Sequence, residues 1–107
     1  MTRKILKRPQ AERDIEEAFV FVAETDFDSG LNFLHAVEQS FEMIAENPFV
    51  GSERKFAAPE LGNVRMWRVK SYEKHLIFYI VRDDAIEVLR VIHSARDYIR
   101  ILDSEEQ

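Results

Sequence analysis

An unbroken apolar run, Leu76-Ile77-Phe78-Tyr79-Ile80-Val81, constrains the fold of this chain more than any other feature. Because both faces of such a segment are apolar, it belongs at the centre of a sheet, and we predict a strand over residues 75–82. Two more strands are predicted over residues 64–71 and 86–93, since short turn segments join all three along the chain. The C-terminal half is therefore predicted to form an antiparallel three-strand meander.

Alternation within the last of these strands predicts which of its side chains share a face. Successive side chains of a strand point to opposite sides of the sheet. One set therefore comprises Ile86, Val88, Arg90 and Ile92, and the other comprises Glu87, Leu89, Val91 and His93.

Two amphipathic helices precede the meander and are predicted to pair as an antiparallel hairpin. The first begins near Pro9, which suits the first helical turn. The second ends at Asn47-Pro48, because the residue before a proline avoids the helical region. Residues 25–30 interrupt the pattern between the two helices. The apolar residues at helical spacing are Ile15, Ala18, Phe19 and Val22 in the first helix and Leu34, Val37, Phe41 and Ile44 in the second.

The remaining segments are short. A strand is predicted over residues 4–7, a loop over residues 48–63 and a short helix over residues 96–102. The acidic side chains of the first helix, including Asp14, are predicted to lie mostly on its solvent face. The sequence shows no internal repeat or linker, so we expect residues 1–107 to form one domain.

Composition limits where the protein works. The chain has no cysteine, which excludes disulfides and thiolate chemistry and fits a reducing compartment. No apolar stretch approaches the ~20 residues that a membrane span needs. The basic N-terminus is followed by no long apolar run, so it is not a secretory signal. We therefore expect a cytoplasmic protein with no membrane association.

Charge is distributed unevenly along the chain, whose net charge is −5. Residues 10–47 carry ten acidic groups against one basic group, whereas residues 64–100 carry eight basic groups against five acidic ones. An anionic partner is therefore expected to meet the C-terminal half only. The alternative is that the acidic helix surface serves solubility.

Two sets of side chains could carry chemistry. His93 ends a strand close in sequence to Arg96 and Asp97, so it could act as a general acid or base, or it could hold the strand end in place. Basic residues interleaved with aromatic ones could bind phosphate and stack on bases, or form a solvated or peptide-binding face. These residues are Arg65, Arg68, Lys70, Lys74, Arg90, Arg96 and Arg100, with Trp67, Tyr72 and Tyr79.

No metal site and no cofactor are expected. The three histidines, His35, His75 and His93, lack the spacing of metal ligands. The three glycines are scattered and form no phosphate-binding loop.

Five segments of the chain form a characteristic series. They are Ala11-Glu12-Arg13-Asp14-Ile15, Asn47-Pro48-Phe49-Val50-Gly51, Val64-Arg65-Met66-Trp67-Arg68-Val69, His75-Leu76-Ile77-Phe78-Tyr79 and Ile86-Glu87-Val88-Leu89-Arg90-Val91-Ile92-His93-Ser94-Ala95-Arg96-Asp97. In this order they resemble the RelE/ParE superfamily, toxins of bacterial type II toxin–antitoxin pairs. The resemblance implies an α+β fold, with an N-terminal strand and an antiparallel helical hairpin packed on a curved antiparallel sheet that ends in a three-strand meander. The element order predicted from the residues agrees with that fold.

The resemblance implies one of two activities. RelE-like members cleave messenger RNA in the ribosome, whereas ParE-like members poison DNA gyrase and are not known as nucleases. Where RelE-type nucleases place two lysines, an arginine and a tyrosine, this chain has Trp67, Val69, Leu76 and Leu102, and only Arg96 is matched. Losing one charge-stabilising donor can slow a reaction ~100-fold or more. We therefore expect a ParE-like inhibitor of DNA gyrase without assigned catalytic residues.

The resemblance also implies a protein partner. A cognate ParD-like antitoxin is expected to neutralise the toxin within a hetero-oligomer and to order a segment on binding. That segment is expected in the groove between the helical hairpin and the sheet, covering Phe19, Phe33 or Phe41 where they are not internal. Direct sequence-specific DNA binding by this chain alone is not expected. Residues expected to contact the antitoxin or the target are Arg65, Trp67, Arg68, Tyr79, Arg90, His93 and Arg96.

Two alternatives remain open. The first is a RelE-like endoribonuclease that cleaves messenger RNA with His93, Arg96, Arg65 and Arg68, because another nuclease subgroup uses a histidine at the strand end. The net charge of −5 argues against it, since binding to a polyanion gains from cationic groups. The second alternative is a degenerate toxin that now only binds its antitoxin.

Overall fold

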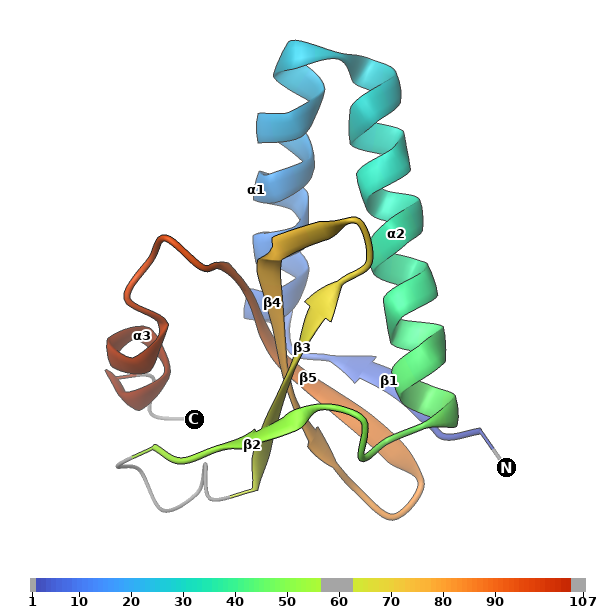
Figure 1. The fold of residues 1–107 in the computed structure, drawn as a ribbon, viewed down its shortest axis with the longest axis vertical. Helices are drawn as coiled ribbons and strands as arrows, with labels where there is room; N and C mark the ends of the chain where they lie inside the picture. Colours follow the sequence, from blue (N-terminus) through green and yellow to red (C-terminus); the bar gives the residue numbers. More distant parts are fainter. Residues whose placement is uncertain (1, 57–62, 105–107) are drawn as a thin grey trace.

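The computed structural model describes residues 2–56 and 63–104, which form one five-stranded sheet with helices on both faces (Figure 1). The elements are β1 (Lys4–Lys7), α1 (Pro9–Thr25), α2 (Phe27–Glu46), β2 (Ser52–Arg54), β3 (Val64–Val69), β4 (Tyr72–Val81), β5 (Ala85–His93) and α3 (Tyr98–Ser104). The strands lie in the order β1-β5-β4-β3-β2. β1 runs parallel to β5, and the other neighbouring pairs are antiparallel. The predicted α+β fold is confirmed, with a parallel strand added at one edge.

The helical hairpin forms as predicted. Pro9 begins α1, where its missing N–H leaves no helical bond unmade. The interruption predicted over residues 25–30 is too long, because only Asp26 separates the two helices. Gly30 of α2 lies so close to α1 that an added Cβ would stand 2.8 Å from the Cβ of Ala23 and 2.9 Å from the ring of Phe19. The two helices therefore pack tightly near their connection. Their distal turns extend past the β3–β4 turn, so the tip of the hairpin projects away from the sheet (Figure 1).

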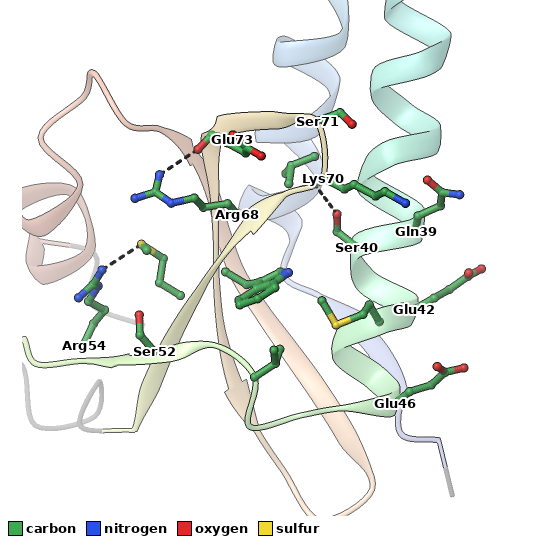
Figure 2. A pocket seen from close by; sticks show the side chains of 15 residues that line it. Gln39, Ser40, Glu42, Glu46, Ser52, Arg54, Arg68, Lys70, Ser71 and Glu73 are labelled. Carbon is green, nitrogen blue, oxygen red and sulfur yellow. Dashed lines mark hydrogen bonds between the residues drawn. The ribbon is translucent and has the colours of Figure 1, made fainter.

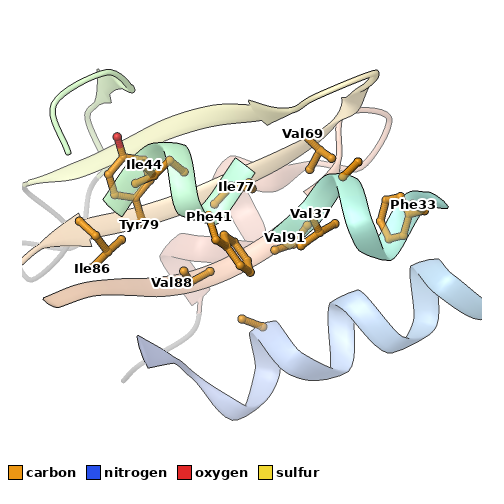
Figure 3. Packing of buried hydrophobic residues seen from close by; sticks show 12 residues of the cluster. Phe33, Val37, Phe41, Ile44, Val69, Ile77, Tyr79, Ile86, Val88 and Val91 are labelled. Atoms are coloured by element: carbon orange, nitrogen blue, oxygen red, sulfur yellow. The ribbon is translucent and has the colours of Figure 1, made fainter. Parts of the chain in front are cut away.

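Two apolar layers cover the two faces of the sheet. On the hairpin side, Phe33 and Phe41 of α2 pack in a cluster with Ile77 of β4 (Figure 3). On the opposite side, Leu102 of α3 packs in a second cluster with Phe78 of β4. Because β4 contributes to both layers, its apolar run lies at the centre of the fold, as predicted.

The ends of several elements differ from the prediction. β3 ends at Val69 rather than at residue 71, because the chain turns at Ser71, whose φ is 67°. β4 consequently begins at Tyr72. The loop predicted over residues 48–63 contains the strand β2, whose three residues pair with β3 but carry no alternating pattern of their own. The predicted C-terminal helix is shifted by two residues, to Tyr98–Ser104.

The facing pattern predicted for β5 holds for Leu89, which lies opposite Val88, and is wrong from Val91 onward. The register of β5 against β4 shifts between Val88 and Arg90, which leaves Leu89 without a partner residue. A bulge of this kind interrupts the strict alternation of a strand. Val88 and Val91 therefore both join the hairpin-side layer, whereas Leu89 and Ile92 join the layer beneath α3.

Candidate functional site

A groove of about 820 Å³ lies between α2 and the edge of the sheet formed by β2 and β3 (Figure 2). Side chains alternate along a strand, so Trp67 and Val69 line the groove from the hairpin side, and Met66 and Arg68 line it from the opposite face. The groove therefore follows the edge of β3 itself. Its lining residues are Gln39, Ser40, Glu42, Met43, Glu46, Val50, Ser52, Arg54, Met66, Trp67, Arg68, Val69, Lys70, Ser71 and Glu73.

The second half of β3 has a free edge. β2 pairs with β3 only at residues 64–66. Within residues 2–56 and 63–104, no other strand lies on that side of residues 67–69. The Lys70 N–H just beyond them donates a hydrogen bond of 2.9 Å to the Ser40 hydroxyl of α2. An unpaired strand edge presents N–H and C=O groups that can pair with another chain, so the groove combines an open backbone edge with apolar side chains.

The two walls of the groove carry opposite charges. Glu42 and Glu46 of α2 make one wall acidic, whereas the sheet side, called the basic wall below, carries Arg54 and Arg68 together with a single carboxylate, Glu73 (Figure 2). The Nε of Arg54 is buried and has no hydrogen-bond partner in the described part of the chain. Its Nη2 lies 3.8 Å from the sulfur of Met66, a weak acceptor.

Tyr79 anchors the loop that leads from α2 into the groove. Its hydroxyl donates a hydrogen bond of 2.8 Å to the Pro48 carbonyl and accepts one of 2.9 Å from the Gly51 N–H. Burial raises the pKa of Tyr79, against the opposing effects of the Gly51 hydrogen bond and the Arg65 charge. Arg65 holds the same loop, because its guanidinium donates to the Gly51 carbonyl at 2.7 Å. The prediction that Tyr79 contacts a partner is therefore wrong, since the whole side chain is internal.

Arg90 also lies inside the protein rather than on a binding surface. Its Nε and Nη2 donate to the two carboxylate oxygens of Asp14 at 2.7 and 2.9 Å, and the two side chains are only 5% and 3% exposed. The Val91 N–H donates to the same carboxylate at 3.0 Å. Two predictions are therefore wrong: Arg90 does not face a partner, and Asp14 does not face solvent. The pair instead joins α1 to β5 beside the bulge.

A second cavity of about 370 Å³ contains His93 and Arg96. It lies between α1 and the ends of β4 and β5, and His75 also lines it. The rings of His75 and His93 meet edge to face with their centroids 5.1 Å apart. The Nδ1 of His93 accepts a hydrogen bond of 3.0 Å from the Ala95 N–H. His93 therefore holds the end of β5 in place, which is one of the two roles that its position in the sequence left open.

Acidification below neutral pH is expected to destabilise the fold through His75. Burial, and secondly the charge of His93, lower the pKa of His75 from its ordinary value of 6.5. As the pH falls through 6.5, the unfolded chain takes up a proton that folded His75 does not, so stability is lost between 6.5 and the lower folded-state pKa. We expect the urea concentration at the midpoint of unfolding to decrease as the pH is lowered from about 7.5 to about 5.5, and to decrease less in His75→Phe.

His35 provides the matched control for this pH dependence, because it is exposed on α2. His35→Gln should show the same fall in the urea midpoint as the wild type. If His75→Phe and the wild type lost stability equally over this range, another group would be responsible.

The structure separates the predicted binding residues into three groups. Trp67 and Arg68 line the groove, His93 and Arg96 line the second cavity, and Arg65, Tyr79 and Arg90 support the fold. Of the three phenylalanines expected beneath a partner, Phe33 and Phe41 are internal. Phe19 packs edge to face against Phe27 at the hairpin connection, with ring centroids 6.1 Å apart, and does not line the groove.

Among the groove residues that were not predicted from the sequence are Arg54, Ser40 and Met43. Arg54 could not be found because its strand has no pattern of its own. Met43 offered a signal: it is an apolar residue that does not belong to the helical series ending in Phe41 and Ile44. Such a single apolar side chain is a weak signal, because isolated apolar residues are common on protein surfaces.

Two classes of site find no support in the described residues. None of their helices combines the length and the apolar character needed to cross a membrane. Residues 2–56 and 63–104 also contain no group of three or more histidines and carboxylates placed to hold a metal ion.

A family model that matches most of the chain places it in a known class, the toxins of the RelE/ParE superfamily. A solved structure titled "Chromosomal ParDE TA system from P. aeruginosa" has a similar fold, with a TM-score of 0.69 and 13% sequence identity, over 86% of this chain and 96% of that chain. Residues 5–98 match the family described as the ParE toxin of the type II toxin–antitoxin system parDE. The chain belongs to the ParE toxin family. No curated protein sequence matches it significantly.

Proposed function

We propose that this chain is a cytoplasmic toxin that inhibits DNA gyrase by binding it, and that a ParD-like antitoxin neutralises it within a hetero-oligomer. Membership of the ParE family supports the toxin role and implies the antitoxin. The observation that carries the proposal is the groove along the free edge of β3, because it suits a protein segment better than a small substrate.

The groove provides what an extended or partly helical segment needs. Trp67 and Met43 offer apolar contact area from opposite walls. The free edge of β3 offers backbone hydrogen bonds, which is how an added strand gains affinity without a particular sequence. The acidic and basic walls then select a segment whose basic residues face Glu42 and whose acidic residues face Arg54.

The arrangement of the alternative nuclease residues favours binding over catalysis. Cleavage of RNA needs a proton-transfer group and a charge-stabilising group close to the same phosphate. His93 and Arg96 line one cavity and Arg68 lines the other, while Arg65 hydrogen-bonds to the loop around Gly51. These four side chains therefore do not converge on one point, which supports a toxin that acts by contact.

The decisive experiment is expression of the chain without an antitoxin. We expect growth arrest, accumulation of gyrase-cleaved DNA and loss of supercoiling by purified gyrase on addition of the purified toxin. Transcripts should remain intact in the same cells. Cleaved messenger RNA with fully active gyrase would overturn the proposal in favour of the endoribonuclease.

Met43→Glu is expected to weaken antitoxin binding by roughly 30-fold, or about 2 kcal/mol, because it places a charge among the apolar side chains of the groove. The probe is the small protein encoded beside this chain, and the measurement is its dissociation constant by calorimetry. Ile99→Glu, a similar change at a 54% exposed position on α3, is the control and should keep wild-type affinity. Equal affinities of Met43→Glu and the wild type would remove the groove as the antitoxin site.

A further inference from the structure

The helical hairpin carries several exposed apolar side chains near the connection of its two helices. Val20 of α1 is 53% exposed, and Phe27 and Leu31 of α2 are 61% and 46% exposed. Phe27 and Leu31 stand one helical turn apart, so they share a face of α2. Phe27 also packs on Phe19 of α1, which links the two helices into one surface. We name these four residues the outer hairpin patch.

The outer hairpin patch lies beside a close contact between the two helices. Gly30 lies between Phe27 and Leu31 in the sequence and meets Phe19 and Ala23 with no room for a side chain. The patch also lies away from both cavities, because none of its four residues lines the groove or the second cavity. Clusters of exposed apolar side chains mark interaction sites more often than single exposed apolar side chains do.

Acidic side chains surround the outer hairpin patch. Glu16 and Glu24 lie one turn before and one turn after Val20 on α1, and Asp28 follows Phe27 directly; all three are exposed. Residues 10–47 as a whole carry ten acidic groups against one basic group. The hairpin therefore combines an apolar centre with a strongly negative rim.

This charge narrows the choice of partner. A second copy of the hairpin would bring two acidic rims together, which costs several kcal/mol when like charges meet. A nucleic acid would be repelled as well, because binding to phosphates needs cations. What remains is a protein surface with an apolar hollow bordered by lysine or arginine.

Position separates this partner from the antitoxin. The groove along β3 is a cavity that suits a segment lying in it. The outer hairpin patch lines neither cavity, so it remains open to a different protein while the groove is filled. We propose that the outer hairpin patch is the surface with which the toxin contacts its target protein, an inference that rests on the proposed toxin function.

Leu31→Glu tests the inference, because Leu31 is exposed on a helix surface and its replacement should not unfold the chain. We expect the concentration needed to inhibit purified DNA gyrase to rise at least tenfold, and growth arrest to be lost at wild-type expression. Binding of the antitoxin should stay within twofold of the wild type, which also shows that the variant is folded. Ile99→Glu on α3 should leave all three readouts unchanged.

Glu24→Lys tests the acidic rim in the same assays. It should weaken gyrase inhibition several-fold at low salt and less at high salt, because salt screens exposed charges. If Glu24→Lys inhibited gyrase as well as the wild type at both salt concentrations, the acidic rim would not contribute to binding of the target.

The possible outcomes distinguish this inference from the proposed function. Wild-type gyrase inhibition by Leu31→Glu would overturn the inference and leave the function standing. If the wild type arrests growth without affecting gyrase and Leu31→Glu abolishes the arrest, gyrase is not the target. The patch would then still be the surface that contacts the target. Loss of antitoxin binding in Leu31→Glu, with gyrase inhibition retained, would assign the patch to the antitoxin instead. A wild-type chain that does not arrest growth would overturn both.

Discussion

Asp14→Ala should lower the free energy of unfolding by about 3–5 kcal/mol, because it leaves a buried guanidinium without its carboxylate partner. Arg90 donates two hydrogen bonds to Asp14, and both side chains are almost fully buried. The Val91 N–H loses its acceptor in the same variant. A domain of this size has a total stability of about 5–15 kcal/mol. Urea denaturation should therefore show a variant that is close to unfolding at 37 °C.

A matched control and a double variant make this prediction specific. Glu17→Ala changes an exposed carboxylate one turn further along α1 and should shift stability by less than about 0.5 kcal/mol. Asp14→Leu combined with Arg90→Met removes both charges and should recover much of the loss, since apolar replacements of buried ion pairs are often tolerated. If Asp14→Ala cost no more than Glu17→Ala, the ion pair would not stabilise the fold.

Gly51→Ala should cost about 3 kcal/mol of stability, from overpacking and a broken hydrogen bond. A Cβ at this position would stand 2.5 Å from the Tyr79 hydroxyl and 2.9 Å from the Met66 carbonyl oxygen. Neither neighbour can move easily, because the phenol is buried and the carbonyl belongs to β3. The loop must therefore shift, and the Gly51 N–H loses its 2.9 Å bond to Tyr79. The thermal midpoint measures the effect.

Tyr79→Phe provides the sharpest test of this clash. In the wild-type chain it removes two hydrogen bonds and should destabilise. In the Gly51→Ala background, Tyr79→Phe also removes the hydroxyl oxygen that the new Cβ would meet. Its cost in stability should therefore be smaller than in the wild-type chain, or the substitution should even stabilise the protein. Ser52→Ala, at the exposed neighbouring position, is the control and should be close to neutral. Additive costs for Gly51→Ala and Tyr79→Phe would contradict the clash.

The regular parts of this fold could be predicted from the sequence because their patterns are local. The apolar run centred on Phe78 and Tyr79 indicated a central strand, and Asn47-Pro48 marked the end of the second helix, where α2 ends at Glu46. Features that depend on a distant partner could not be predicted. Asp14 sits on the edge of the apolar face of α1 and becomes internal only because Arg90, far along the chain, reaches it.

The bulge in β5 limited the prediction in another way. A period of two assigns each residue to one face, and a single extra residue reverses every assignment after it. Leu89 is that residue, so Val91 and Ile92 face opposite to expectation. No residue type in this strand signals a bulge, because glycine, the most visible marker, is absent from it.

The candidate site was predicted only in part for a related reason. Trp67 and Arg68 could be found because they are unusual residue types in a strand that the sequence indicated. Arg65 is of the same type but is held by the Gly51 carbonyl, a contact that depends on the path of a loop. Charge and residue type thus identified candidates, and only the fold could separate the binding residues from the supporting ones.

The pairing of β1 with β5 also means that the N-terminal strand has to wait for a partner that is synthesised much later. The first strand of the chain has its partner in the last one, since Lys4 pairs with Ala85 and Lys7 with Val88. A ribosome releases the N-terminus first, at about 5–20 residues per second. Until β5 emerges, β1 has no neighbour and the helical hairpin has no complete sheet beneath its apolar face. A product that lacks β5 leaves β1 unpaired and the core beneath the hairpin incomplete, so we expect it not to fold stably.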